Sequence, residues 1–170
     1  FYLSDVSVPY EQCEYDMNFV GHFCNNKNIF DRPTILSYLQ DFSKHYGLNS
    51  YLYLKYSRHK SKLYKYLGIS NKYEKLVLKY EHEPFMHEES LLLQQVEDRQ
   101  ENAKIILDLS HANRQGMTIN VITALAKGKK LITTNKRIVD EPFYNSQNIY
   151  ILDSKTPHLD IEFLSLIHIS

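Results

Sequence analysis

The polar segment of residues 110–118 holds the side chains of this chain that are best suited to chemistry. Gly116, near its end, lets backbone N–H groups approach a ligand closely, and Met117 opens a stretch with helical spacing. A helix amino terminus in such a loop attracts anions, and nearby side-chain donors strengthen that attraction. The segment therefore predicts a phosphate-binding site. The candidate binding side chains in this segment are those of His111, Asn113, Arg114, Gln115 and Thr118.

Two strands and one helix are expected to position this segment. Residues 104–109 form a short apolar run with β-branched members, typical of a strand covered on both faces. Residues 117–127 predict a helix that stops at Gly128, and residues 131–134 predict the next strand. In such a β-α-β unit the segment lies at the carboxyl ends of the strands, where α/β sheets bind ligands. The helix has apolar residues at helical spacing: Ile119, Ile122 and Ala126.

A second turn at the same edge is expected after the strand at residues 17–21. Gly21 and His22 occupy this turn, and Arg32 follows as a possible phosphate partner. Each candidate also has a purely structural explanation, such as a helix-entry glycine, a solvated loop arginine or a satisfied imidazole. The sequence leaves both explanations open.

The rest of the chain alternates between strand-like and helix-like runs. This order predicts an α/β, Rossmann-like fold, a mostly parallel sheet flanked by helices with right-handed crossovers. Leu92, Leu93 and Val96 are expected to point inward from one of the helices. Further strands are expected at residues 50–56, 76–78 and 148–153, helices at 29–46, 58–67 and 86–100, and a short helix or turn at 135–140.

The composition fits one folded domain. The chain has 170 residues, 43% of them hydrophobic, and a formal net charge of zero, so no overall charge attracts it to nucleic acid. Cys13 and Cys24 are too few for a disulfide framework and lack zinc-finger companions, so we expect free thiols in a reducing compartment. The sequence contains no signal peptide and no apolar run of about 18 residues.

The two ends predict a fragment of a longer protein. Residues 1–15 begin without an initiating Met and are irregular, which predicts a linker from a preceding domain. Residues 16–163 predict the Rossmann-like domain. Residues 164–170 close no visible element and are expected to be a non-native tail.

Basic and tyrosine side chains alternate between residues 51 and 80, and an acidic stretch follows between residues 81 and 101. Two solvated helix faces would explain this pattern. Attraction to an anionic membrane surface is the functional alternative, because Tyr is enriched at the level of lipid headgroups and Lys is attracted to anionic lipids. An RNA groove with stacked bases is the less favoured third explanation.

Four sequence motifs are spread along the chain. They are Tyr15-Asp-Met-Asn-Phe-Val-Gly21, Leu107-Asp-Leu-Ser-His-Ala-Asn-Arg-Gln-Gly-Met-Thr118, Lys129-Lys-Leu-Ile-Thr-Thr-Asn-Lys136 and Phe143-Tyr-Asn145. With them, residues 16–153 resemble the carboxyl-terminal domain of GT-B-type glycosyltransferases. The closest group is that of bacterial lipopolysaccharide and capsular-polysaccharide biosynthesis proteins. The sheet would then be one half of a GT-B fold.

This resemblance implies a function for the complete protein. The domain would bind a nucleotide-diphosphate sugar as donor, without a metal or other cofactor. A glycan or lipid-linked acceptor would bind to a missing amino-terminal domain, so these residues alone are not expected to catalyse transfer. The protein would be cytoplasmic, at the inner face of the cytoplasmic membrane if the Lys/Tyr-rich segment meets lipid, and no nucleic-acid partner is expected.

Two residues depart from the family pattern. Thr123 stands where the group has a Glu that grips the ribose, and Asn120 replaces an Arg. A non-catalytic, degenerate Rossmann-like module therefore remains an alternative, as does a membrane or RNA adaptor. The catalytic residues stay unknown, and no metal ligand is expected. The implied donor-binding residues are Gly21, His22, Arg32, His111, Asn113, Arg114, Gln115, Gly116, Met117, Thr118 and Thr123.

Overall fold

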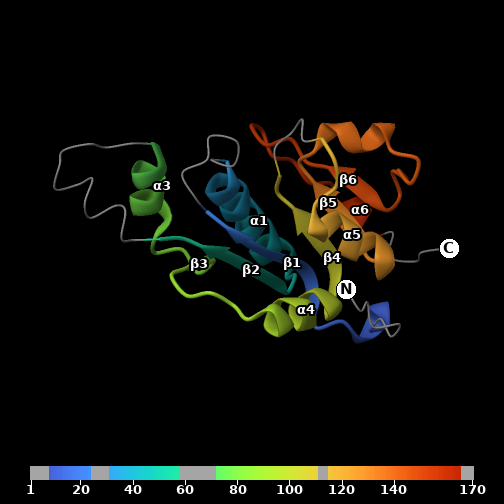
Figure 1. Ribbon diagram of the computed structural model, residues 1–170, viewed down its shortest axis with the longest axis horizontal. Coiled ribbons are helices and arrows are strands. Elements are labelled where there is room, and N and C mark those ends of the chain that lie inside the picture. The colour runs from blue at the N-terminus through green and yellow to red at the C-terminus, as the bar shows by residue number, and fades with distance from the viewer. Residues whose placement is uncertain (1–7, 24–30, 58–71, 111–114, 166–170) are drawn as a thin grey trace.

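A six-stranded, all-parallel sheet forms the centre of the structure, a computed structural model that describes residues 8–23, 31–57, 72–110 and 115–165 (Figure 1). The strand order is β3-β2-β1-β4-β5-β6. The predicted α/β, Rossmann-like fold is thereby confirmed. The strands are β1 (Tyr15–His22), β2 (Ser50–Lys55), β3 (Met86–His87), β4 (Ala103–Asp108), β5 (Lys130–Thr133) and β6 (Ile149–Ile151).

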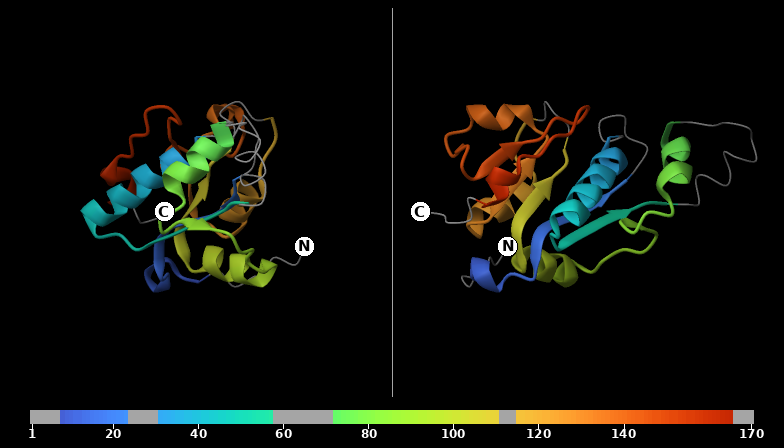
Figure 2. Two further views of the ribbon diagram at one scale, coloured as in Figure 1. Left: turned by 90° about the vertical axis from the view of Figure 1, so that its left-hand side faces the viewer. Right: turned by 180° about the vertical axis from the view of Figure 1, so that it is seen from behind.

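Helices cover both faces of the sheet, as the end-on view in Figure 2 shows. One core joins α1, α3 and α6 to the sheet, and a second, smaller core joins α5 to β4 and β5. The helices are η1 (Tyr10–Gln12), α1 (Arg32–Tyr46), α3 (Lys72–Tyr80), α4 (Leu93–Glu101), α5 (Ile119–Ala126), η3 (Lys136–Asp140) and α6 (Ile161–Ser165). α6 includes Leu164, which is buried in the larger core.

The strand order reverses between β1 and β4. The chain runs from β1 through α1 to β2, whereas β4 continues through α5 to β5 on the other side. The two connections leave the carboxyl ends of β1 and β4 in opposite directions. A crevice at such a switch point is where open α/β sheets bind their ligands.

One predicted strand is part of a helix, and one predicted helix begins with a strand. The run at residues 76–78 was expected to be a strand, but it lies within α3, where Tyr73, Val77 and Tyr80 are buried at helical spacing. The prediction was wrong because three successive apolar residues mimic a strand when the spacing around them is ignored. The third strand is instead β3, at the start of the predicted helix of residues 86–100, where Met86 pairs with Leu54.

Two helices bury faces that the apolar spacing did not predict. Leu92 and Leu93, expected to point inward, are 71% and 70% exposed, and α4 begins only at Leu93. In α5, Val121 and Ala124 are buried, whereas Ile119 and Ile122 are exposed. α5 has apolar residues on several faces, so its pattern does not show which face packs on the sheet.

The described tyrosines of the Lys/Tyr-rich segment are mostly core residues. Tyr56, Tyr73 and Tyr80 belong to the larger core, and the Tyr73 ring stacks on Phe23 with 4.8 Å between centroids. Tyr53 is also buried. These side chains are therefore not displayed to a lipid or RNA surface. The helix predicted at residues 58–67 lies outside the described residues.

No helix among the described residues is long and apolar enough to span a membrane.

Candidate functional site

A buried carboxylate organises the carboxyl edge of the sheet. Asp108, the last residue of β4, is 3% exposed. Its Oδ2 accepts hydrogen bonds from Ser110 Oγ (2.9 Å) and Thr133 Oγ1 (2.8 Å), and its Oδ1 accepts one from Thr118 Oγ1 (2.9 Å). A buried charge is tolerated only when such donors replace its water. The carboxylate thus joins β4, β5 and α5 at one point.

Thr118 links this carboxylate to the start of α5. It is the N-cap residue, and its Oγ1 accepts a hydrogen bond from Val121 N at 3.2 Å while donating to Asp108. The hydroxyl proton is therefore committed to the protein. Thr118 was predicted to offer this hydroxyl to a ligand; the structure instead uses it to fix the helix amino terminus beside the β4 tip.

The turn between β4 and α5 is open at its surface. Gln115, Gly116 and Met117 are exposed and directly precede the N-cap. Gly116 has φ of 78°, a left-handed conformation that favours glycine, and a Cβ there would meet no atom within 4 Å. Glycine is therefore favoured at position 116 by its positive φ, and not because a side chain would clash with neighbouring atoms. In the first turn of α5, the N–H of Val121 donates to Thr118 Oγ1, whereas those of Ile119 and Asn120 have no acceptor within the helix.

Arg32 spans the switch point. It is the first residue of α1, and its Nε donates to Leu109 O (2.7 Å) while its Nη1 donates to His22 O (2.6 Å). One guanidinium therefore holds the carboxyl ends of β1 and β4 at a fixed separation. The planar fork of Arg suits this two-point contact, which a Lys ammonium on its flexible stem would not reproduce.

Gly21 supports Arg32 indirectly. A Cβ at Gly21 would lie 2.6 Å from Cζ of Phe19, so glycine makes room for that ring. The Arg32 guanidinium lies over the Phe19 ring, 5.8 Å from its centroid. Among the predicted donor-binding residues, Gly21 and Arg32 thus shape the edge of the sheet, while His22 is exposed at the end of β1.

The remaining predicted residues fall in two places. His111, Asn113 and Arg114 lie outside the described residues. Thr123 is buried and lines a groove of about 560 Å³ between α4 and α5, together with Val20 and Ile119. It therefore lies one turn inside the helix, beside α4.

Asn120 lines the same groove and is used within the protein. Its Nδ2 donates to Leu107 O (3.1 Å), and its Oδ1 accepts from Gln100 Nε2 (3.0 Å). The side chain thus joins α5 to β4 and α4. Both polar ends of the Asn120 amide are therefore occupied within the protein.

Sequence reasoning missed several polar residues at the tips of β4 and β5. Thr134 Oγ1 donates to Ser110 O (2.6 Å), and Asn135 caps η3 by accepting a hydrogen bond from Arg137 N. Polar residues directly after two apolar strands were the available signal. The missed residues are Ser110, Thr133, Thr134 and Asn135.

Two exposed cations lie after β5, at the same edge of the sheet. Lys136 Nζ donates to Asp153 Oδ2 at 2.8 Å, and Arg137 is exposed on η3. The Lys136 hydrogen bond, followed by the backbone N–H groups of Lys155 and Thr156, holds the pKa of Asp153 well below its usual range. The positive charge of Lys136 is therefore balanced by the Asp153 carboxylate.

The described residues contain no group of three or more His, Cys, Asp or Glu side chains placed to hold a metal ion. Comparisons of the chain with protein-family models, with curated proteins and with solved structures found no match.

Proposed function

We propose that this chain is the nucleotide-sugar donor-binding half of a glycosyltransferase in bacterial surface polysaccharide biosynthesis, of the lipopolysaccharide or capsule type. The carrying observation is the exposed turn of Gln115, Gly116 and Met117 at the strand-order reversal, directly before the amino terminus of α5. This is the position at which a parallel sheet offers backbone N–H groups to phosphate.

The proposed chemistry needs few side chains at this site. Transfer from a nucleotide-diphosphate sugar requires stabilisation of a leaving diphosphate as its charge develops. The N–H groups of Gly116, Met117 and Ile119 would bind the phosphate oxygens, since that of Val121 already donates to Thr118 Oγ1. Arg32 would act by fixing the spacing of β1 and β4, because its Nε and Nη1 donate to carbonyl oxygens. The acceptor would be bound by a second domain, and we expect no transfer by these residues alone.

A degenerate, non-catalytic module is the second candidate, and specific contacts favour it. Asn120 donates to β4 and accepts from α4, and Thr123 is buried where it lines the α4–α5 groove. The Asp108 carboxylate, linked to the Thr118 N-cap, already lies in the positive field of the α5 amino terminus and weakens its attraction for phosphate.

Calorimetric titration separates these candidates. The donor-binding proposal predicts saturable binding of one nucleotide class when UDP, GDP and CMP are titrated separately into the protein at equal ionic strength. Binding of none of them would select the degenerate module. Salt-sensitive binding to anionic vesicles or RNA, without nucleotide affinity, would select the adaptor.

A further inference from the structure

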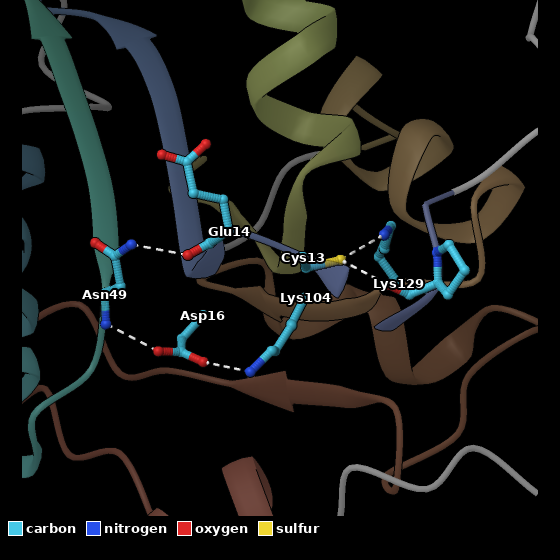
Figure 3. Close-up of polar contacts among 7 residues, drawn as sticks. Cys13, Glu14, Asp16, Asn49, Lys104 and Lys129 are labelled. Carbon is cyan, nitrogen blue, oxygen red and sulfur yellow. Dashed lines mark hydrogen bonds and ion pairs between the residues drawn. The ribbon is translucent and has the colours of Figure 1, made fainter. Parts of the chain in front are cut away.

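A cysteine and a lysine from distant parts of the sequence meet at the amino edge of the sheet (Figure 3). Lys129 Nζ lies 3.2 Å from Cys13 Sγ and donates a second hydrogen bond to Val8 O at 3.1 Å. Lys129 is only 6% exposed, whereas Cys13 is a free, partly exposed thiol. The sulfur is therefore reachable from solvent, and the buried amine is held against it.

The surrounding contacts keep this pair in place. Cys13 lies between η1 and β1, and Lys129 lies between α5 and β5. Next to them, Lys104 Nζ pairs with Asp16 Oδ1 at 2.8 Å, and Asn49 Nδ2 donates to Glu14 O at 2.8 Å (Figure 3). The segment carrying Cys13 is thus fixed to β2 and β4 from its carboxyl side.

We propose that Cys13 and Lys129 form an oxidative covalent crosslink, with peroxide as the oxidant. Peroxide first converts the Cys13 thiol to a sulfenic acid and releases one water. The Lys129 amine, after losing its ammonium proton to solvent, attacks the sulfur and displaces hydroxide, which takes a proton from the attacking nitrogen and leaves as a second water. The net step joins Sγ to Nζ, oxidises sulfur by two electrons and reduces one peroxide to two waters.

The geometry favours this product over further oxidation. A sulfenic acid condenses with whichever nucleophile reaches it first, including nitrogen. Lys129 Nζ is already in contact with the sulfur, and its burial prevents it from turning away. The crosslink ties η1 to the start of β5, across 116 positions of the sequence. Because the bond constrains the unfolded chain, it raises the urea midpoint of unfolding.

Mass spectrometry of the full chain tests the crosslink. The experiment uses Cys24→Ser protein, so that no intramolecular disulfide forms, treated with one equivalent of hydrogen peroxide. We expect the intact mass to fall by two hydrogen atoms, proteolysis to yield one species linking the Cys13 and Lys129 peptides, and dithiothreitol to restore the starting mass.

Two lysine variants supply the controls. Lys129→Arg keeps the charge but removes the nucleophilic amine, so its sulfenic acid should persist and be trapped by dimedone. Lys104→Arg, at the neighbouring ion pair, should crosslink like the parent protein. Oxygen addition at Cys13 without a linked peptide, or linkage of Cys13 to a different amine, would overturn the proposal. If Lys129→Arg fails to fold, the intact mass and the linked peptide of the Cys24→Ser protein alone decide whether the crosslink forms.

Discussion

The carboxylate of Asp108 and the hydroxyl of Thr118 are joined by a hydrogen bond of 2.9 Å, from Thr118 Oγ1 to Asp108 Oδ1. This contact couples the end of a buried strand to the beginning of the helix that follows it. It therefore holds together the two ends of the segment that joins them. The shape of the candidate site therefore depends on a bond that lies beneath it.

Removing either partner of this bond should destabilise the fold. Thr118→Ala loses the N-cap and a bond to a charged acceptor, so we expect the free energy of unfolding to fall by about 2 kcal/mol. Asp108→Ala leaves three hydroxyl groups without their acceptor and should lower it by about 3 kcal/mol. Urea denaturation measures both.

A double-mutant cycle can measure the interaction free energy between Asp108 and Thr118. Thr118→Ser keeps the hydroxyl and should retain most of the stability, and Thr156→Ala on an exposed loop should stay within about 0.5 kcal/mol of the parent. In the double variant, the losses from Asp108 and Thr118 should be non-additive by about 1 kcal/mol. Strict additivity would show that the two side chains act independently.

Arg32 should tolerate neither Lys nor Met. Both variants lose at least one charged hydrogen bond to a strand-end carbonyl, and we expect a decrease of about 2 kcal/mol in unfolding free energy. Arg137→Met, on exposed η3 at the same edge, is the matched control and should change stability by less than about 0.5 kcal/mol. Equal effects of the Arg32 and Arg137 changes in thermal unfolding would contradict the assigned role of Arg32.

Lys130 should make stability depend on pH. Its side chain is fully buried in β5, and its Nζ donates to Phe163 O at 2.7 Å. Burial lowers the pKa of Lys130 below its usual 10.5. Between the lowered value and 10.5 the unfolded chain binds more protons than the folded protein, so the unfolding free energy should rise with pH across that window.

Lys130→Met should remove this part of the pH dependence. A methionine of similar length avoids burying a charge, so we expect no large loss of stability at neutral pH despite the unpaired Phe163 carbonyl. Urea midpoints measured from neutral pH to pH 10.5 check both statements. The same slope in parent and variant would show that another group is responsible.

The sequence predicted the fold from its alternation of strands and helices, but it assigned two elements and two helix faces wrongly. β1, β4 and β5 are apolar and bounded by turn residues, so periodicity was sufficient for them. β3 has two residues and is defined by its pairing with Leu54 and Lys55, which no local pattern reveals. Likewise, exposure of Leu93 depends on where α4 crosses the sheet.

The sequence predicted the turn between β4 and α5, but not the contacts that hold its two ends. Gly116 indicated the turn, because a left-handed glycine before a helical run has a local signature. The sequence could not show that Asp108 would accept a hydrogen bond from Thr118, or that Arg32 would donate to the carbonyl groups of His22 and Leu109. Those partners are fixed by strand register and by the crossing of the chain at the switch point.

A matched pair of glycine variants gives the sharpest test of the donor site. Gly116 and Gly128 lie at opposite ends of α5, with φ of 78° and 60°, and a Cβ added at either glycine would meet no atom within 4 Å. Replacing either with Ala should lower stability by a similar amount, about 1 kcal/mol, through backbone strain alone. Any difference in ligand binding then reports the position and not the strain.

The decisive measurement is nucleoside-diphosphate titration of the parent, Gly116→Ala and Gly128→Ala proteins, followed by calorimetry and by amide NMR spectra. We predict perturbed amides at Gly116, Met117 and Ile119 in the parent, an affinity reduced about tenfold, or 1.4 kcal/mol, in Gly116→Ala, and unchanged affinity in Gly128→Ala. No binding by the parent, or perturbation confined to the α4–α5 groove or the amino edge, would contradict a donor site at the β1–β4 switch point.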